Sequence, residues 1–503
     1  MSDIISSKNK ASESEIITAL KSENALLKEQ LAEVQEQFEW LKKQMFGRKT
    51  EQTSVVMDDS RQLSFFPDNV QAVSVKSEEI TVPEHKRKKK RTYDEWMKTL
   101  EIKEEHHEIE NPVCEHCKSE MEEIGEEKAY DELIYTPAKY HIRRHFVKKY
   151  KCPECGKNPE TSTEPCNIVR AEAPMPMIPR SFCSPELLAH IIYEKFCKAV
   201  PLHRQEKDYN SKGIPLLKAT MSNWVCYAAE KWCSPIVDEM KKRLLSGNVI
   251  HADETVLQVL HEEDRKATTD SRMWVYCNGK ENDSNIVIFD YQQTRGGEHP
   301  ARFLKDYSKY LVCDGYDAYN AVTTAVRCGC MAHTRRKFVE AMPTDKELQK
   351  TSVAAKAVEY CNRIYHEENL LKDLSAEERY NQRLVKEKPL LEAFFAWLET
   401  IQVSGKGKLS KAIGYALNER EYLCRFLENG NIPIDNNRAE NAIRPFTVGR
   451  KNWLFNNTAK GAKCSAILYS IISTAQTNGL DVEKYLTELF SCTDGTLLMP
   501  WNH

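Results

Sequence analysis

Residues 432–455 read IPIDNNRAENAIRPFTVGRKNWLF, and this stretch decides how the rest of the chain is interpreted. Pro433 and the polar run 435–437 predict a turn that leads into a helix. The helix carries Glu440 near its start, and we expect it to end at Pro445, which cannot continue the helical hydrogen bonds. A basic and aromatic run follows the acid: Arg444, Arg450, Lys451, Trp453 and Phe455.

Two interpretations of this stretch stay open at this point. A carboxylate near a helix start, followed by cations and rings, suits a site where a metal ion meets a phosphate backbone. The alternative is structural, because Asn437 and Glu440 fit a capping box and Glu440 with Arg444 is a common i,i+4 pair. Two further carboxylates on upstream strands would favour the site.

The composition indicates a multidomain protein. At 503 residues the chain is too long for one domain, and its 41% hydrophobic residues can bury several cores. Its 72 basic and 75 acidic side chains leave a net charge of −3, which neither demands nor excludes nucleic acid. The charge is segregated along the chain, because 85–91 (HKRKKKR) is basic whereas 101–127 is rich in Glu.

No segment predicts export or a membrane span. The first residues, MSDIISSKNK, lack the apolar centre of a secretion signal, and no apolar run is long enough to cross a bilayer. The 17 cysteines are scattered through a large chain, which is typical of reduced thiols with one metal site. We therefore expect a cytoplasmic protein without a membrane partner.

The N-terminal segment 15–47 predicts a coiled coil. Two rows of residues recur every seven positions, offset by three, over about four heptads. Asn24 lies in one row, where Asn fixes the register of parallel dimers. The alternative is one amphipathic helix packed on its own domain. Residues 48–105 lack a sustained period, and we interpret them as a linker that contains the basic run.

Residues 106–167 predict a zinc ribbon. Two CxxC pairs supply the four thiolates that structural zinc prefers: Cys114, Cys117, Cys152 and Cys155. The spacer between the pairs is longer than the commonest template and contains strand-like sequence at 135–147, flanked by basic residues. We predict one structural Zn²⁺ and a basic strand surface.

Residues 168–245 predict a connector followed by helices. Apolar residues from Leu187 to Phe196 recur on one helical face, and 201–232 is interpreted as two helices around a turn at Gly213. The spacing resembles a DNA-binding helix-turn-helix. A plain helical hairpin is the alternative.

The hydrophobic period changes at residue 248. Segments rich in β-branched residues predict strands at 248–260, 273–277, 285–291, 310–313 and 326–331, with a short helix at 296–306. Three strands, a helix, a strand, a helix and a strand is similar to the order of a ribonuclease-H-like α/β core, which we place at 246–460. An all-helical insertion at 342–430 interrupts it, with a capping box at Ser375 and Glu378. Residues 461–503 form a C-terminal helical segment.

Two acids of this core complete the pattern. Asp253 lies on the first strand and Asp314 at the end of the fourth, and these strands are neighbours in such sheets. Glu440 would close the triangle from the last helix. Three hard oxygen ligands suit Mg²⁺ or Mn²⁺, and two such ions can clamp the attacking and the leaving oxygen of a phosphodiester. We therefore predict Asp253, Asp314 and Glu440 as catalytic metal ligands.

Neighbouring groups compete for these roles. Four carboxylates are interpreted as surface or turn residues, with the first on the opposite strand face: Glu254, Asp290, Asp317 and Asp435. Cys328 and Cys330 fit small buried hydrophobic residues better than a second metal site. His333 fits a contact near the scissile phosphate and a core histidine equally well.

Five motifs resemble those of the insertion-sequence-66 transposases. They are HADET at 251–255, CDGYDAY at 313–319, GCMAHTRRKF at 329–338, DNNRAENAIRP at 435–445 and GRKNWLF at 449–455. The resemblance covers nearly the whole chain. It implies a bacterial DDE transposase that cleaves the ends of its own element and joins them to target DNA. Asp253, Asp314 and Glu440 match the acidic triad of that family.

The resemblance also implies partners. These are the double-stranded DNA of the transposon ends and of the target, a second copy of the chain or more, and small helper proteins of the same element. We expect association with the nucleoid when DNA is bound. The candidate DNA contacts are Arg336, Lys337, Arg444, Arg450, Lys451 and Trp453, with core packing as the alternative for the tryptophan.

Two other functions fit part of the chain. A non-catalytic, zinc-containing DNA-binding regulator would explain the first 245 residues but would leave 246–460 without a role. A metal-dependent DNA nuclease without strand transfer would use the same acids. Strand-transfer products separate that nuclease from a transposase.

Overall fold

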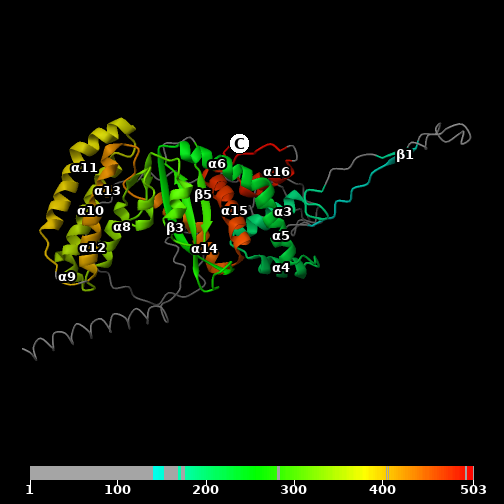
Figure 1. The fold of residues 1–503 in the computed structure, drawn as a ribbon, viewed down its shortest axis with the longest axis horizontal. Coiled ribbons are helices and arrows are strands. Elements are labelled where there is room, and N and C mark those ends of the chain that lie inside the picture. Colours follow the sequence, from blue (N-terminus) through cyan, green and yellow to red (C-terminus); the bar gives the residue numbers. More distant parts are fainter. Residues whose placement is uncertain are drawn as a thin grey trace, which may run out of the picture. The chain divides into compact units, whose positions relative to one another are not determined.

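A mixed β-sheet is the central element of the described residues (Figure 1). Its strands follow the order β5–β4–β3–β6–β7. The computed structural model describes residues 140–151, 168–170, 176–279, 284–403, 405, 407–492 and 495–501. They belong to the second of the two units into which the chain divides, residues 136–503. The predicted coiled coil, the linker with its basic run and the four zinc cysteines lie outside the described residues.

The five predicted core strands are confirmed. β3 (Val249–His261), β4 (Asp270–Asn278) and β5 (Val287–Gln292) form an antiparallel meander. On the other side of β3, β6 (Tyr310–Val312) and β7 (Val326–Cys328) are parallel strands. The predicted short helix is α7 (Glu298–Phe303).

The connection from β6 to β7 departs from the predicted order. It contains a single 3-10 turn, Asp317–Ala321, where we expected a helix. Tyr319 in this turn is buried and its hydroxyl donates to the Glu254 carboxylate at 2.6 Å. This anchor holds the short connection against the sheet.

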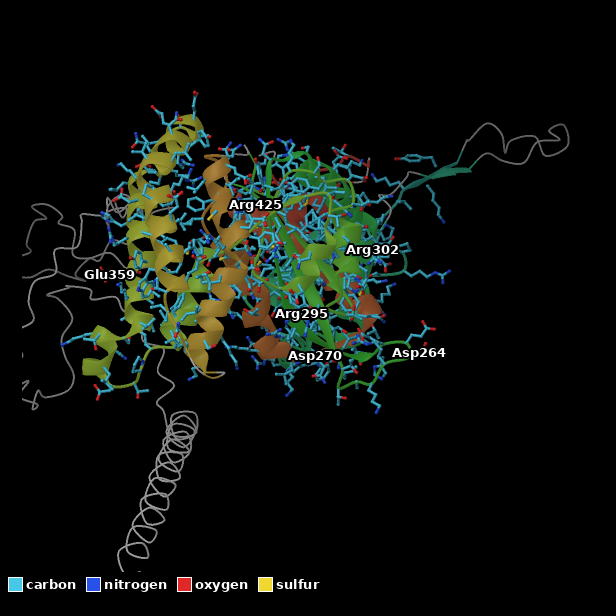
Figure 2. The ribbon with its side chains drawn as sticks, turned by 60° about the vertical axis from the view of Figure 1, so that its left-hand side comes forward. Asp264, Asp270, Arg295, Arg302, Glu359 and Arg425 are labelled. Atoms are coloured by element: carbon cyan, nitrogen blue, oxygen red, sulfur yellow. The ribbon has the colours of Figure 1, made fainter. Side chains whose placement is uncertain are left out.

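Alternate residues of the sheet face two hydrophobic cores, as the period of a strand requires. Ile250 faces a core built with the helices at 185–246 and 437–491, whereas Val249 faces a core built with the helix at 331–340 and the insertion. Figure 2 shows both parts of the molecule, with Glu359 on the helices of the insertion and Asp270 on the sheet. The sheet therefore links the two cores.

The segment before the sheet is helical, as predicted. It contains α3 (Pro185–Phe196), α4 (Leu202–Ser211), α5 (Lys218–Ala228), a π-helical turn (Ala229–Cys233) and α6 (Ser234–Ser246). Gly213 makes the turn between α4 and α5 with φ +77°, which favours glycine. DNA binding by this helical pair stays a prediction.

The strand expected within 135–147 is absent from the described part of that segment. Residues 140–148 form no strand, and β1 (Lys149–Lys151) pairs antiparallel with β2 (Ile168–Arg170). The strand-like composition of the earlier segment lacks a partner in the described residues, and a strand requires one.

The insertion is helical throughout its regular elements. After α8 (Met331–Glu340) come α9 (Lys346–Thr351), α10 (Val353–Leu370), α11 (Ala376–Glu399), α12 (Lys408–Asn418), α13 (Arg420–Cys424) and a 3-10 turn (Arg425–Glu428). The capping box of Ser375 and Glu378 is confirmed at the start of α11. The predicted apolar face of α11 packs into the second core.

The helix of the opening motif, α14 (Asn437–Trp453), does not end at Pro445. The proline ring is exposed, while Ile443 and Phe446 on the buried face pack against the sheet side of the molecule. An internal proline costs about 3 kcal/mol. Burial of the apolar side chains on this face offsets that cost, and the helix therefore continues.

The last elements are a short strand and two further helices, and one of these helices covers the sheet. β8 (Asn456–Thr458) pairs with the far end of β3, and α15 (Ala459–Thr477) and α16 (Val482–Ser491) follow. α15 packs along β5, where the Ser470 hydroxyl accepts from the Phe289 amide at 2.8 Å and Thr474 accepts from the Val287 amide at 3.0 Å. In the described part of the chain, no helix is long and apolar enough to cross a bilayer.

Candidate active site

Asp253 and Asp314 lie at the same level of two adjacent parallel strands. His251 of β3 is in register with Val312 of β6. Each aspartate lies two residues further along its strand direction, so both side chains point to the same face of the sheet. The backbone pairing thus brings together two acids that the sequence separates widely.

The turn that carries Asp314 is held by the insertion. The Gly315 amide donates to the Tyr415 hydroxyl of α12 at 3.1 Å, and a Cβ at position 315 would lie 2.5 Å from the Tyr415 ring. Arg327 donates to the Asp314 carbonyl at 3.0 Å and to the Glu419 carboxylate at 2.6 Å. This buried ion pair and the glycine contact fix the backbone of Asp314.

Asn436 connects the start of α14 to β3, the strand that carries Asp253, by side-chain hydrogen bonds. It is fully buried, its Nδ2 donates to the Ala252 carbonyl at 2.7 Å, and its Oδ1 accepts from His251 Nδ1 at 3.0 Å. The backbone amide of Asn436 also donates to the Cys330 sulfur at 3.1 Å. The predicted capping box is wrong, because Asn436 is the N-cap residue and its side chain binds β3 instead of the helix.

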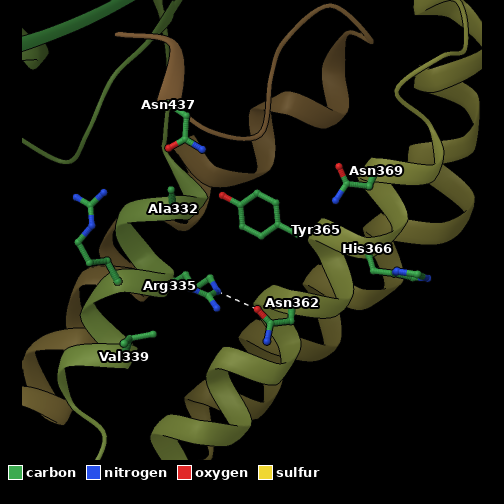
Figure 3. Close-up of a pocket in the computed structure, with 9 residues that line it drawn as sticks. Ala332, Arg335, Val339, Asn362, Tyr365, His366, Asn369 and Asn437 are labelled. Atoms are coloured by element: carbon green, nitrogen blue, oxygen red, sulfur yellow. Dashed lines mark hydrogen bonds between the residues drawn. The ribbon is translucent and has the colours of Figure 1, made fainter. Parts of the chain in front are cut away.

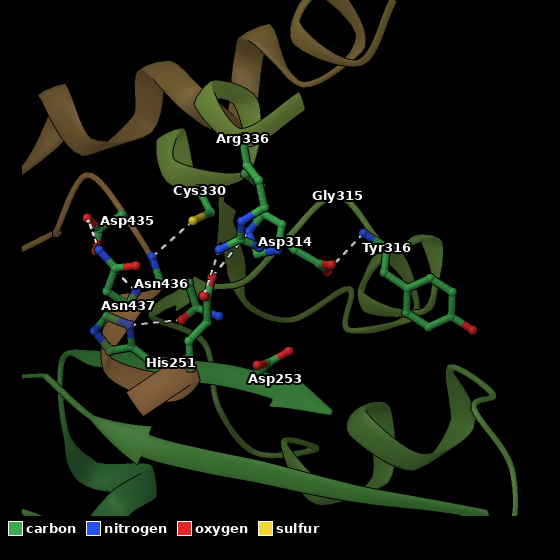
Figure 4. Close-up of polar contacts among 12 residues, drawn as sticks. His251, Asp253, Asp314, Gly315, Tyr316, Cys330, Arg336, Asp435, Asn436 and Asn437 are labelled. Atoms are coloured by element: carbon green, nitrogen blue, oxygen red, sulfur yellow. Dashed lines mark hydrogen bonds and ion pairs between the residues drawn. The ribbon is translucent and has the colours of Figure 1, made fainter. Parts of the chain in front are cut away.

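Glu440 lies in the first turn of α14 and binds Arg336 of α8, which Figure 4 shows together with Asp253 and Asp314. Its Oε2 accepts from Arg336 Nη2 at 2.9 Å, and its Oε1 lies 3.5 Å from His333 Nδ1. Arg336 and His333 of α8 therefore orient the Glu440 carboxylate.

The electrostatics show that the three acids share one environment. Burial, together with the negative charges of Glu254, Asp314 and Glu440, raises the pKa of Asp253 to about 8. Burial lowers the pKa of His333, while Asp314 and Glu440 oppose that change. A site that raises the pKa of a carboxyl in this way favours a bound cation.

The metal-competent cluster of the site differs from the predicted triad. In the described part of the chain, the group whose ligand atoms lie close enough together for a metal ion is Cys330, His333 and Glu440, within 4.8 Å of one another, and it contains one of the three predicted acids. Burial raises the pKa of the Cys330 thiol to about 12, which disfavours a thiolate ligand, and the hydrogen bond from the Asn436 backbone amide only partly offsets this rise. The predicted ligands Asp253, Asp314 and Glu440 carry the oxygen donors that a hard divalent cation prefers, and Glu440 would leave Arg336 to join the strand acids.

The competing carboxylates have structural partners or positions. Glu254 points away from Asp253 and pairs with Arg295 at 2.5 Å. Asp435 accepts from Asn437, Asp290 accepts from Gln292, and Asp317 is exposed in its 3-10 turn. Asp317 and Asp435 therefore fit the interpretation as surface or turn carboxylates, whereas the Glu254 carboxylate is only 3% exposed and does not fit it.

Two of the predicted DNA contacts lie beside the acids on α8. Arg336 binds Glu440, and Lys337 places its ammonium 4.5 Å from the centre of the Tyr415 ring. Arg444 and Lys451 are exposed on α14. A role of these four residues in DNA binding stays a prediction.

The other two predicted contacts have structural roles. Arg450 donates to the Thr255 hydroxyl at 3.1 Å and to the Val256 carbonyl, so it ties the end of α14 to β3. Trp453 is partly buried and packs edge-on against Phe446, with ring centres 5.5 Å apart. The core-packing alternative for Trp453 accounts for these contacts.

Sequence reasoning gave no role to His251, Asn436, Arg327 or Tyr415. His251 and Asn436 lie inside the motifs that carry the acids. That position was the one feature of the sequence that could have indicated their role. Arg327 and Tyr415 belong to β7 and the insertion, and no local pattern connects them to Asp314.

The fold and site define a multidomain protein in which a mixed sheet gathers acids beside basic side chains. Comparison with known families gives a match to the model described as "Transposase IS66 family" over residues 180–464. Residues 111–156 match "zinc-finger binding domain of transposase IS66", and residues 33–104 match "Transposase C of IS166 homeodomain". The chain belongs to the IS66 transposase family.

Three similar proteins come from Sinorhizobium fredii (strain NBRC 101917 / NGR234). "Uncharacterized protein y4hP" is 27% identical over 484 residues, 90% of this chain and 84% of that protein. "Uncharacterized protein y4qI" is 29% identical over 75% of this chain and 71% of its own length. "Uncharacterized protein y4jD" is 28% identical over 78% of this chain and 79% of its own length.

Proposed function

We propose that this protein is a DDE transposase that binds the ends of its insertion sequence and catalyses metal-dependent strand cleavage and strand transfer. The observation that supports the proposal most directly is that Asp314 and Glu440 lie near enough to Asp253 for their charges to act on it, with Arg336 paired to Glu440. Membership of the IS66 family supports it. The sheet order and the following helices support a ribonuclease-H-like description of the core.

The three acids would hold two Mg²⁺ or Mn²⁺ ions. Such ions activate an attacking hydroxyl and stabilise the departing 3′-oxygen of a phosphodiester. The chain supplies positions and charges: Asn436 orients the start of α14, and the Arg327–Glu419 pair fixes the turn of Asp314. Arg336 supplies a guanidinium that can pair with a phosphate oxygen once it leaves Glu440.

The other domains would bring DNA and a second copy of the chain to this site. The zinc-finger match supports one structural Zn²⁺ on the four cysteines of the CxxC pairs. The coiled coil would pair two chains and thereby two transposon ends. The helices α4 and α5, Arg444 and Lys451 are proposed DNA contacts, and helper proteins of the same element are proposed partners.

Isosteric removal of each acid tests the proposal. Asp253→Asn, Asp314→Asn and Glu440→Gln should each abolish Mg²⁺-dependent cleavage and strand transfer on DNA that carries the element's ends. Folding and end binding should be retained, since only the charge changes. Asp317→Asn, an exposed neighbour, is the matched control and should remain active. Full cleavage by any triad variant would remove that residue from the proposed site, and cleavage without joined products would indicate a nuclease.

A further inference from the structure

A groove of about 610 Å³ opens between α8 and α10, next to the acidic site (Figure 3). It is connected to that site by two residues. Arg336 lines the groove and also binds Glu440, and Asn437 lines it from the first position of α14. A molecule in the groove would therefore reach the proposed catalytic acids.

Each wall is a helical stripe without negative charge. On α10, the groove-lining residues follow the i, i+3, i+4, i+7 spacing of one helix face: Asn362, Tyr365, His366 and Asn369. None of the described residues that line the groove is a carboxylate, although α10 itself carries Glu359, Glu367 and Glu368. The opposite wall on α8 carries Arg335 and Arg336. An anionic ligand with polar edges fits these walls.

Arg335 is prepared to bind such a ligand. Its Nε donates to Asn362 Oδ1 at 2.8 Å, which joins the two walls and restricts the guanidinium. The hydrogen bond occupies Nε, and Nη1 and Nη2 can form the bidentate contact that arginine makes with phosphate. The side-chain amide of Asn369 can pair with a base edge, whereas that of Asn437 donates to the Asp435 carboxylate at 2.7 Å.

The size of the groove favours unpaired nucleotides. Its volume is typical of sites for small molecules, which range from about 300 to 1,000 Å³, and a DNA duplex would not enter such a space. Bases that are not paired expose their hydrogen-bonding edges to side chains. We infer that the groove holds a short single-stranded segment of DNA, one or more nucleotides from the scissile phosphate.

This inference rests on the proposed function. It means that the insertion binds part of the DNA substrate. The insertion would then hold one unpaired strand while the acids act on the phosphate beside it. Since α10 belongs to the insertion and α8 and α14 flank it, the groove exists only when the insertion packs on the core.

Photo-crosslinking with the full chain tests the inference locally. p-Benzoylphenylalanine replaces His366 in the groove, or Arg363 as the control, an exposed residue of α10 outside the groove. The probes are a mixed-sequence duplex with a labelled single-stranded tail and the same duplex with blunt ends. No Mg²⁺ or Mn²⁺ is added, so cleavage does not enter the measurement.

Position 366 should crosslink to the tail several-fold more than position 363, and more than to the blunt duplex. Arg335→Gln should reduce that crosslink and lower the slope of log affinity against log salt by about 1, while Arg363→Gln should not. Equal crosslinking at both positions, or equal crosslinking to the blunt duplex, would overturn the inference. Asp253→Asn should leave the crosslink intact, so failure of the catalytic proposal is distinguishable from failure of this one.

Discussion

At the scale of single residues, the acids were predictable and their supports were not. Asp253, Asp314 and Glu440 were proposed because motif composition and strand assignment point to them. Asn436 was missed because a polar residue before a helix normally caps that helix. Here it binds the Ala252 carbonyl and His251 from a distant part of the chain, a long-range contact that no local pattern encodes.

Replacing Asn436 should therefore cost both stability and activity. Asn436→Ala removes the hydrogen bonds to the buried Ala252 carbonyl and to His251, and we expect a loss of about 1–3 kcal/mol in the free energy of unfolding. Glu440 would also lose its fixed position, so cleavage should fall more than end binding. Urea unfolding and cleavage assays measure the two effects.

Asn441→Ala is the control for this prediction. Asn441 is exposed on the same helix, and its replacement should change unfolding by less than about 0.5 kcal/mol. Equal stability of the Asn436 and Asn441 variants would contradict the role of Asn436 in positioning α14.

At the scale of elements, the hydrophobic period predicted the strands and the helical insertion. The hydrophobic period did not predict the elements whose length or position depends on tertiary contacts. α14 runs through Pro445 because its buried face packs on the sheet, and α15 was not expected as an element that covers β5. A sheet edge needs partners for its backbone amides, and the Ser470 and Thr474 hydroxyls of α15 supply them.

Removing these hydroxyls should destabilise the sheet edge. In Ser470→Ala the buried Phe289 amide loses its acceptor, at a cost of about 1–3 kcal/mol, and Thr474→Val has the same effect at Val287. Ser491→Ala, on the exposed end of α16, is the control. Hydrogen exchange should accelerate at residues 287 and 289, and unchanged protection there would refute the contact.

The insertion contains a buried carboxyl that should make stability depend on pH. Glu387 on α11 is fully buried, and burial together with the neighbouring Glu368 carboxylate raises its pKa from 4.5 to about 9. The folded state therefore binds a proton more tightly than the unfolded state. Its stabilising effect is complete below about pH 4.5 and is lost as the pH rises toward 9.

Glu387→Gln should remove this dependence. The variant should resemble the original protein in acid and exceed its stability by on the order of 1 kcal/mol or more near pH 8. Glu392→Gln, an exposed change on the same helix, is the control. Thermal unfolding between pH 5 and 9 measures the difference, and parallel curves for the two variants would exclude a buried proton at Glu387.

At the scale of the whole molecule, the order of domains was predicted from motifs, and the family matches lie at residues 33–104, 111–156 and 180–464. The match at 111–156 contains both CxxC pairs, and the match at 180–464 contains all three acids. The spatial relation of the acids required the sheet register. No spacing in the sequence could supply it, because the insertion separates the acids along the chain.

Zinc removal should separate DNA binding from the acidic site. Metal analysis should find one Zn²⁺ per chain, and Cys114→Ser should lose it because a tetrahedral site needs all four ligands. End binding should weaken, while the thermal unfolding of the described core should stay unchanged. Cys492→Ser, a thiol far from either CxxC pair in sequence, is the control. Full zinc content in Cys114→Ser would contradict the assigned ligand set.

The late position of α14 has a consequence for synthesis of the chain. The strands that carry Asp253 and Asp314 leave the ribosome long before Glu440 does, and N-terminal domains fold first. Under the proposed function, a nascent or prematurely terminated polypeptide would occupy transposon ends without the means to cut them. Shortened products that stop before residue 432 should therefore act as dominant inhibitors of the complete protein.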